Sequence, residues 1–198
     1  MAILKVARMG HPVLNRIAEP VANPQTLEIH RLITDMVDTM ADAPGIGLAA
    51  PQVHVSKRVV IFHVPESRTR MAAEEAGEDE DEEEEFEAVP MTVLINPEIE
   101  FLSDEVKFGV EGCLSLPDMA GEVPRHTHIL YKALAPDGSA IEREASGYHA
   151  RVVQHECDHL DGILYPQRMD DLSLFGFADE MRRGDEEISA GPESEGEL

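Results

Sequence analysis

The stretch Gln154-His155-Glu156-Cys157-Asp158-His159-Leu160 decides how the rest of this chain must be arranged. Two histidines four residues apart lie about one turn apart on the same face of a helix. At that spacing both imidazoles can reach one metal ion, and the glutamate after the first histidine can take a proton from a water beside the ion. The stretch therefore predicts a helix over residues 147–160 that presents His155, Glu156 and His159 to a metal.

A metal held by two histidines of one helix needs a further ligand from elsewhere in the chain. Cys113 is a candidate because it lies next to a glycine at the end of an expected strand, and a thiolate is a good soft ligand. Other histidines and the many carboxylates remain alternatives at this point, since a lone cysteine is more often an inert core residue. Cys157 lies two residues past His155, so we expect it to point away from the metal and to be buried.

Other polar residues near these stretches have simpler structural interpretations. His126 and His128 alternate along an expected strand, so they are interpreted as strand surface rather than as metal ligands. Arg125 and Arg151 flank these stretches and can hold either Glu111 or a substrate, and a structural ion pair is the preferred interpretation. A solvated helix face is the corresponding simple interpretation of the two-histidine pattern, and the apolar residues around that pattern argue against it.

The pattern of apolar and turn residues predicts a mixture of helices and strands. Expected helices cover residues 24–43, 147–160 and 172–183, and expected strands cover residues 3–7, 58–64, 92–101, 105–111, 123–135 and 140–146. Residues 45–52 are so rich in Gly, Ala and Pro that we expect a tight loop without regular structure. Helices and strands do not alternate in a βαβ rhythm, so the expected fold class is α+β.

The chain is strongly acidic, but its charge is unevenly distributed. Its 198 residues carry a formal charge of −24; residues 74–87 hold eleven acids, residues 185–198 hold six, and without these seventeen acids the charge is −7. An acidic surface repels nucleic acid phosphates, which argues against DNA as a partner. We expect residues 71–89 to form a solvated insertion and the tail beyond Gly184 to be disordered.

Cysteine usage and hydropathy indicate the compartment. Two cysteines in a chain of this length do not form a disulfide scaffold, so we expect a reducing compartment. The start of the chain lacks the layout of a signal peptide, and no apolar run approaches the roughly 20 residues that cross a membrane. We therefore expect a soluble, cytoplasmic protein without membrane contact. Nothing in the sequence fixes the oligomeric state, for which a monomer is our expectation.

Three stretches together resemble the motifs of the peptide deformylase family. They are GIGLAAPQ at residues 45–52, EGCLS at residues 111–115 and QHECDHL at residues 154–160, in that family's order. The resemblance runs from about Ile3 to Met169. It implies mixed, mostly antiparallel sheets packed around a central metal-binding HExxH helix, with a second long helix near the N-terminus. It also implies a catalytic domain over residues 1–170, followed by a C-terminal helix and acidic tail over residues 171–198.

The resemblance implies an activity as well, namely metal-dependent hydrolysis that removes the formyl group from the N-terminal methionine of new polypeptides and releases formate. In that family one cysteine and two histidines bind a single divalent metal, and here these are Cys113, His155 and His159. Fe²⁺ is the expected ion in the cell, and Zn²⁺, Ni²⁺ or Co²⁺ can replace it. The family's proton acceptor corresponds to Glu156, and its oxyanion donors correspond to the Gln52 side chain and the Leu114 backbone N–H.

The substrate implied by the resemblance is an N-formylmethionyl peptide that pairs with the protein as an extended strand. The backbone expected to approach it lies at Gly45, Ile46, Gly47 and Gly112. The acidic insertion departs from the family pattern in its length. Docking on the ribosome is one use for it, and a solvated loop is the preferred interpretation.

Three other functions share part of these features. A zinc-dependent peptidase also needs the two-histidine helix and Glu156, but it does not need EGCLS or GIGLAAPQ. A silent relative that only binds nascent chains should have lost a ligand or Glu156, and none is missing. A metal-storage or regulatory module predicts no role for Gln52. Formate release from formyl-methionyl peptides, measured against cleavage of internal peptide bonds, distinguishes a deformylase from a zinc-dependent peptidase.

Overall fold

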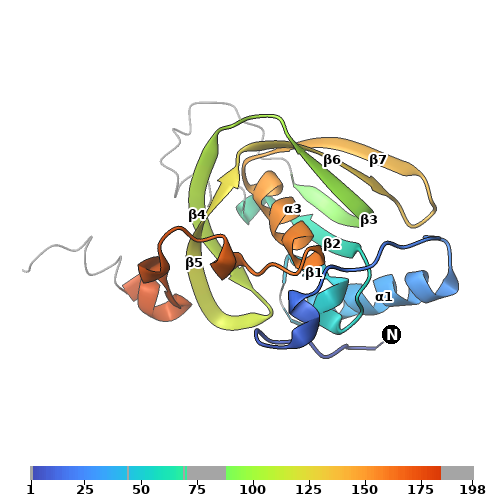
Figure 1. Cartoon of the computed structure of the whole chain (residues 1–198), viewed down its shortest axis with the longest axis horizontal. Helices are drawn as coiled ribbons and strands as arrows, with labels where there is room; N and C mark the ends of the chain where they lie inside the picture. The colour runs from blue at the N-terminus through green and yellow to red at the C-terminus, as the bar shows by residue number, and fades with distance from the viewer. Residues whose placement is uncertain (1, 44, 69, 71–87, 184–198) are drawn as a thin grey trace, which may run out of the picture.

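The computed structural model describes residues 2–43, 45–68, 70 and 88–183 (Figure 1). The two long helices are α1 (Leu27–Asp42) and α3 (Gly147–Leu160), and short 3₁₀ helices are η1 (Pro12–Asn15), η2 (Ala50–Val53), η3 (Tyr165–Gln167) and η4 (Leu172–Leu174). The strands are β1 (Gly47–Ala49), β2 (Val59–Val64), β3 (Val89–Phe101), β4 (Val106–Cys113), β5 (Leu116–His126), β6 (His128–Leu134), β7 (Ala140–Ser146) and β8 (Phe175–Phe177).

The strands form two separate antiparallel sheets. One has five strands in the order β1-β2-β3-β6-β7, and the other has three strands in the order β4-β5-β8. Figure 1 shows α3 in the middle of the molecule, with the β4–β5 pair on one side and β1 and β2 on the other. The expected α+β class with antiparallel sheets is confirmed.

Strand β2 joins the two helices through its two faces. Val60, Phe62 and Val64 belong to the apolar cluster that includes α3, and Val59 and Ile61 belong to the cluster that includes α1. Successive side chains of a strand point to opposite faces, so a strand covered on both sides reads as an unbroken apolar run. The run at 59–64 has this character, and the expected strand at 58–64 is confirmed.

Helix α1 forms where the apolar periodicity predicted a helix. Thr26 caps its N-terminus, because its hydroxyl accepts the Ile29 N–H at 3.3 Å. The helix starts three residues later than expected, since Pro24 and Gln25 precede this cap. Its buried residues Met36 and Met40 pack against the five-stranded sheet.

Helix α3 is buried over most of its length. Its Val153, Cys157 and Leu160 pack into the same cluster as Tyr131 and Phe62 of the five-stranded sheet. The prediction that Cys157 is a buried side chain is confirmed, since 7% of its surface is exposed. The side chain of Gln154 reaches the junction of β5 and β6, where it accepts the His126 N–H at 3.2 Å and donates to the His126 carbonyl at 2.8 Å.

Four expectations about regular structure were wrong. Residues 3–7 form no strand; Ala7 instead donates its N–H to the Gln52 carbonyl at 2.7 Å. Residues 45–52 are not an irregular loop, because they contain β1 and the start of η2. The single strand expected over 123–135 is two strands in different sheets, divided at Thr127. The helix expected over 172–183 covers only 178–183, since η4 and β8 precede it.

The division at Thr127 also corrects the interpretation of two histidines. His126 ends β5 and His128 begins β6, so they do not share one strand face. His126 stacks on Phe101 with ring centroids 3.9 Å apart, and His128 bonds Glu144 at 3.1 Å. Neither belongs to a metal-ligand cluster among the described residues.

Neither α1 nor α3, nor any other helix in the described part of the chain, has the length and apolar character needed to span a membrane. The predicted insertion, apart from residues 88–89, and the predicted tail lie outside the described residues.

Candidate metal centre

Three side chains that can bind a metal meet between β4 and α3. The ligand atoms of Cys113, His155 and His159 all lie within 4.8 Å of one another. The Cys113 Sγ lies 3.3 Å from the Nε2 of His159. One sulfur and two imidazole nitrogens suit a transition metal or zinc, so the donor set fits the metal that the sequence predicted.

Two local features bring these side chains together. On α3, the spacing of four residues puts both imidazoles on one face, with ring centroids 5.0 Å apart. On β4, the register with β5 shifts between Gly112 and Cys113, and Cys113 then pairs with Leu116 across a two-residue turn. Such a shift redirects the side chain at the end of a strand. Leu114 lies in this turn, directly after Cys113.

His155 is held in position by a buried carboxylate. Its Nδ1 lies 2.8 Å from an oxygen of Glu111. The Glu111 carboxylate also accepts two hydrogen bonds from the guanidinium of Arg125, at 2.8 and 2.9 Å, and one from Arg151 at 3.0 Å. Burial opposes ionisation of Glu111, but bonds from Arg125 and His155 outweigh it and keep its pKa well below the usual value. An ionised partner at Nδ1 leaves Nε2 of His155 as the free lone pair.

The ion pairs of Glu111 confirm the expectation for Arg125 and Arg151, but the network extends further than the sequence suggested. Arg125 also donates to Asp158 at 2.6 Å, and Asp158 accepts from Arg168 at 2.7 Å. Asp158 is the fourth residue of the HECDH stretch, so its place between the two histidine positions was the signal that could have drawn attention to it. The network ties α3 to β4 and β5.

Cys113 lies next to both imidazoles. Burial disfavours its thiolate, but the neighbouring His159 and His155 outweigh this effect and hold the pKa of the thiol well below its usual value. An ionised sulfur is the form that binds metals. The Nδ1 of His159 is buried without a hydrogen-bond partner among the described residues.

Glu156 points into the site from the same helix. It is 4% exposed, and its Oε2 has no hydrogen-bond partner among the described residues. Burial raises the pKa of Glu156 to about 7. A Cβ on Gly47 would lie 2.0 Å from Oε1 of Glu156, so the absence of a side chain at position 47 makes room for this carboxylate.

Gln52 is oriented by three contacts. Its Oε1 accepts the Ala49 N–H at 2.8 Å, and its Nε2 donates to the Ser115 hydroxyl at 3.1 Å and lies 3.4 Å from the Cys113 sulfur. The bond from Ala49 fixes the amide so that its NH₂ faces Cys113. Ser115 was part of a quoted motif, but its contact with Gln52 was not predicted, because nothing in the spacing brings positions 52 and 115 together.

The remaining predicted residues are Gly45, Ile46 and Gly112. Gly45 lies against Leu114, because a Cβ on the glycine would lie 2.9 Å from a methyl of that leucine. Ile46 accepts the His63 N–H through its carbonyl at 2.9 Å. Gly112 is exposed on β4, beside Cys113. The structure thus brings the predicted residues of all three motifs to one place.

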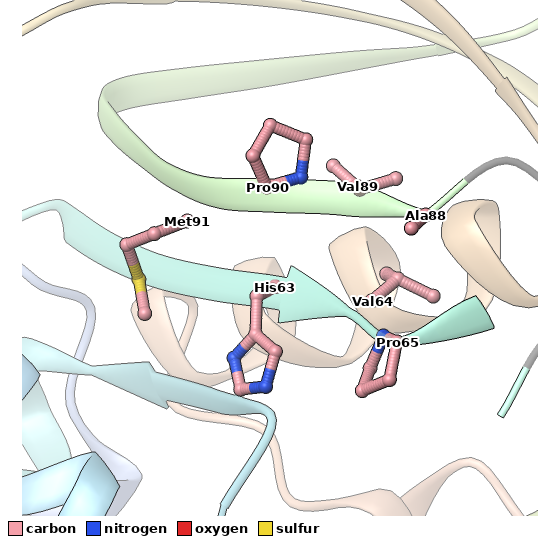
Figure 2. Close-up of a pocket in the computed structure, with 7 residues that line it drawn as sticks. All are labelled: His63, Val64, Pro65, Ala88, Val89, Pro90 and Met91. Atoms are coloured by element: carbon pink, nitrogen blue, oxygen red, sulfur yellow. The ribbon is translucent and has the colours of Figure 1, made fainter. Parts of the chain in front are cut away.

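A second hollow lies apart from these groups. It has a volume of about 480 Å³ and is lined by seven residues from the adjoining ends of β2 and β3, His63, Val64, Pro65, Ala88, Val89, Pro90 and Met91 (Figure 2). None of the candidate metal ligands lines it, and its walls are apolar except for His63. We assign no ligand to this hollow.

The site contains a thiolate, two imidazoles, a buried carboxylate and an oriented amide. These groups define the class of protein as a metal-dependent hydrolase. Comparison with known proteins is more specific. The model of the family described as polypeptide deformylase matches residues 3–174. This chain belongs to the peptide deformylase family, the metal-dependent hydrolases that remove the N-terminal formyl group from new polypeptides.

Individual relatives support the same assignment. Peptide deformylase 1 of Bordetella pertussis is 50% identical over 174 residues, which cover 88% of this chain and 92% of the relative. A Met-Ala-Ser-bound crystal structure of the class I type b enzyme from Acinetobacter baumannii is 38% identical, with a TM-score of 0.73 over 85% of this chain and 99% of that one. The Ehrlichia chaffeensis enzyme is 29% identical with a TM-score of 0.73, over 99% of this chain and 100% of that one.

Proposed function

We propose that this deformylase holds its divalent metal with Cys113, His155 and His159 and uses Glu156, Gln52 and the Leu114 N–H for the reaction. The observation that carries the proposal is that the three ligand atoms lie within 4.8 Å of one another. The sulfur and imidazole donors suit Fe²⁺, which we propose as the ion in the cell, and also Zn²⁺, Ni²⁺ or Co²⁺.

The reaction replaces the C–N bond of the formamide by a C–O bond from water. Cys113, His155 and His159 would hold the divalent ion, which would supply a Lewis acid to polarise the water and the formyl oxygen. The Glu156 carboxylate takes one proton from the attacking water, and the water oxygen forms a bond to the formyl carbon. Glu156 then returns the proton to the leaving amine as the C–N bond breaks. The products are a free N-terminal amine and formic acid, which releases the second proton of the water to become formate.

Negative charge develops on the formyl oxygen during this attack. The NH₂ of Gln52 already points toward Cys113, because Ala49 holds the other end of the amide. We propose that this NH₂ and the Leu114 N–H donate to the oxygen. A neutral donor that is already oriented costs no rearrangement when the charge appears, and one such donor contributes about 10²–10³-fold in rate.

The proposed substrate is an N-formylmethionyl polypeptide bound as an extended strand. The relative from Acinetobacter baumannii was solved with Met-Ala-Ser bound, which supports a peptide in the same place here. Gly45 lies against Leu114 and Gly47 against Glu156, while Gly112 directly precedes Cys113. We therefore propose that the backbone of residues 45–47 and of Gly112 approaches the peptide. Since newly made polypeptides are the substrate, we propose a cytoplasmic enzyme; a monomeric state and a ribosome contact remain predictions.

The test is formate release from formyl-Met-Ala-Ser by the metal-loaded enzyme and by Glu156→Gln. We expect the variant to keep its metal, measured by elemental analysis, and to lose about 10³-fold in kcat/KM, because the proton transfer has no acceptor. Glu98→Gln, a change at an exposed carboxylate on β3, is the matched control and should retain full activity. Equal rates for wild type and Glu156→Gln would refute Glu156 as the proton acceptor.

A further inference from the structure

Strand β4 has one free edge. It is the outer strand of its sheet, since the order is β4-β5-β8, and its only strand partner among the described residues is β5. The strand ends in the candidate centre, at Gly112 and Cys113, and runs away from it toward Val106. A free strand edge presents a row of unpaired backbone groups, which is the template that an extended peptide can join.

The register of β4 and β5 tells which backbone groups face that edge. Phe108 lies opposite Pro124, and proline has no N–H to give to a ladder. Phe108 therefore belongs to a pair that is not hydrogen-bonded to β5, so its own N–H and C=O point outward. The register is regular from Val106 to Gly112, so the backbone groups of every second residue from Phe108 point outward as well. The outward groups are those of Val106, Phe108, Val110 and Gly112.

The side chains of these same residues form an exposed apolar row. Val106 is 42% exposed, and Phe108 and Val110 are each 54% exposed. They alternate along the strand, so all three lie on the face of the sheet that is turned away from α3. Exposed apolar residues that occur singly need no explanation, but three in register with a free edge make a continuous surface.

The opposite face of β4 is fixed to α3. Arg151 donates to the carbonyls of Gly109 at 3.2 Å and Lys107 at 2.8 Å, and its guanidinium fills the space that a side chain at Gly109 would occupy. The alternate residues of β4 are thus anchored from behind. An edge that is already rigid loses little entropy when a peptide joins it.

We propose that the free edge of β4 and its row of Val106, Phe108 and Val110 bind the nascent chain beyond its first three residues. This proposal rests on the proposed function, which puts the formylated N-terminus beside Cys113. A peptide that starts there and runs toward Val106 is antiparallel to β4. Its residues opposite Gly112, Val110, Phe108 and Val106 are two apart, so a chain of about eight residues covers the whole edge.

The occupant follows from continuity with the substrate site. The outward groups of Gly112 belong to the same edge as those of Phe108, and nothing in the described residues interrupts the edge between them. The bound strand would place every second side chain over Phe108 and its neighbours, where cross-strand apolar pairs form. The enzyme should therefore favour apolar residues at alternate positions of the emerging chain.

The first test compares three formylated peptides with the metal-loaded enzyme. One is formyl-Met-Ala-Ser, and the other two extend it to eight residues with Val and Ser alternating in opposite phase. We expect kcat/KM for the better octapeptide to be about tenfold above that for the tripeptide and about threefold above that for the opposite phase. Equal values for all three peptides would overturn the proposal.

Two variants locate the effect. Phe108→Thr keeps a strand-forming residue and removes the apolar surface, so the difference between the two phases should fall to less than about 1.5-fold. Phe177→Thr is the matched control, because Phe177 is 58% exposed on β8, at the opposite edge of the same sheet. It should keep the threefold difference, and an equal loss in both variants contradicts a track along β4.

The second test examines the backbone pairing. Each amide from residue 4 to residue 8 of the better octapeptide is N-methylated in turn, which removes one donor at a time. Loss of kcat/KM at every second position supports pairing with one strand edge, and uniform loss or none overturns it. Binding of the unformylated octapeptides by fluorescence anisotropy should show the same period.

Two further outcomes are informative. A wild-type dimer that Phe108→Thr converts to a monomer, measured by sedimentation, assigns this edge to a second copy of the chain and overturns the proposal; a monomer supports it. If formyl-Met-Ala-Ser itself is not hydrolysed, the proposed function fails. Hydrolysis of the tripeptide without any effect of length or phase refutes only the proposal for β4.

Discussion

Strands β2 and β4 both lie beside α3, but they are stabilised in different ways. Every residue of β2 is apolar except His63, and five of its six residues are buried. In β4 only Glu111 is buried, and its carboxylate is held by Arg125, Arg151 and His155. The comparison teaches that β2 is held by apolar packing on both faces, whereas the strand that carries Cys113 is anchored to α3 by charge. The second arrangement leaves the other face of β4 open.

The largest effect is expected for Glu111→Gln, which removes the charge that anchors β4. The change leaves the buried Arg125 and the half-buried Arg151 without their shared carboxylate, which costs about 3–5 kcal/mol of unfolding free energy. It also weakens the acceptor at Nδ1 of His155, so metal affinity should fall about 10–100-fold. Denaturant unfolding and competition with a chelator measure the two effects. An unchanged metal affinity would show that Glu111 supports the fold alone.

A matched pair of smaller changes sharpens the contrast. Val60→Ala in β2 removes buried methyl groups and should cost about 2 kcal/mol, because Val60 is 0% exposed. Val106→Ala in β4 removes the same groups from a side chain that is 42% exposed, and should cost less than about 0.5 kcal/mol. Urea unfolding of the two variants under one condition gives the comparison directly. Equal costs would contradict the division of roles between the strands.

A further effect, smaller than that of Val60→Ala, concerns pH and His149 on α3. Its ring lies 5.8 Å from Phe62 and 5.7 Å from Tyr131, and burial, with the nearby Arg143, lowers the pKa of His149 to about 4. The neutral ring stabilises the fold fully above pH 6.5, and this contribution is lost as pH falls from 6.5 toward 4, because the unfolded chain binds the proton first.

The loss should be on the order of 1 kcal/mol, since the ring is partly exposed and screened. Unfolding of wild type and His149→Gln at pH 7 and pH 4.5 isolates this histidine from the other titrating groups. The wild type should lose more stability than the variant over that range. An equal loss of unfolding free energy in both proteins would show that His149 does not contribute to the pH dependence of stability.

The sequence predicted the elements whose signals are local. Helix α1 has its cap and its apolar period within one stretch, and β2 is apolar at every position except His63, so both could be predicted directly. Strands β1 and β8 have three residues each and are strands only because β2 and β5 pair with them. Pairing between distant segments overrides weak local preference, so no local pattern could predict them.

The candidate site follows the same division. The two histidines and Glu156 share one helical pattern, and the motif resemblance supplied Cys113 and Gln52. The contacts that orient them could not be predicted in the same way. Gln52 and Ser115 are far apart in the sequence, and Arg168, which bonds Asp158, lies outside the three motifs. Side chains that act through another residue have no spacing of their own, so the structure was needed to identify them.

The missing side chain at position 47 has a consequence for inhibition. Any substituent there must first displace the carboxylate of Glu156, because the two would occupy the same volume. An inhibitor whose contacts are confined to the Gly47 backbone and the Glu156 carboxylate would bind a surface that a substitution at position 47 can alter only by moving Glu156. Resistance by substitution at these two positions should therefore be rare among variants that still grow by deformylation.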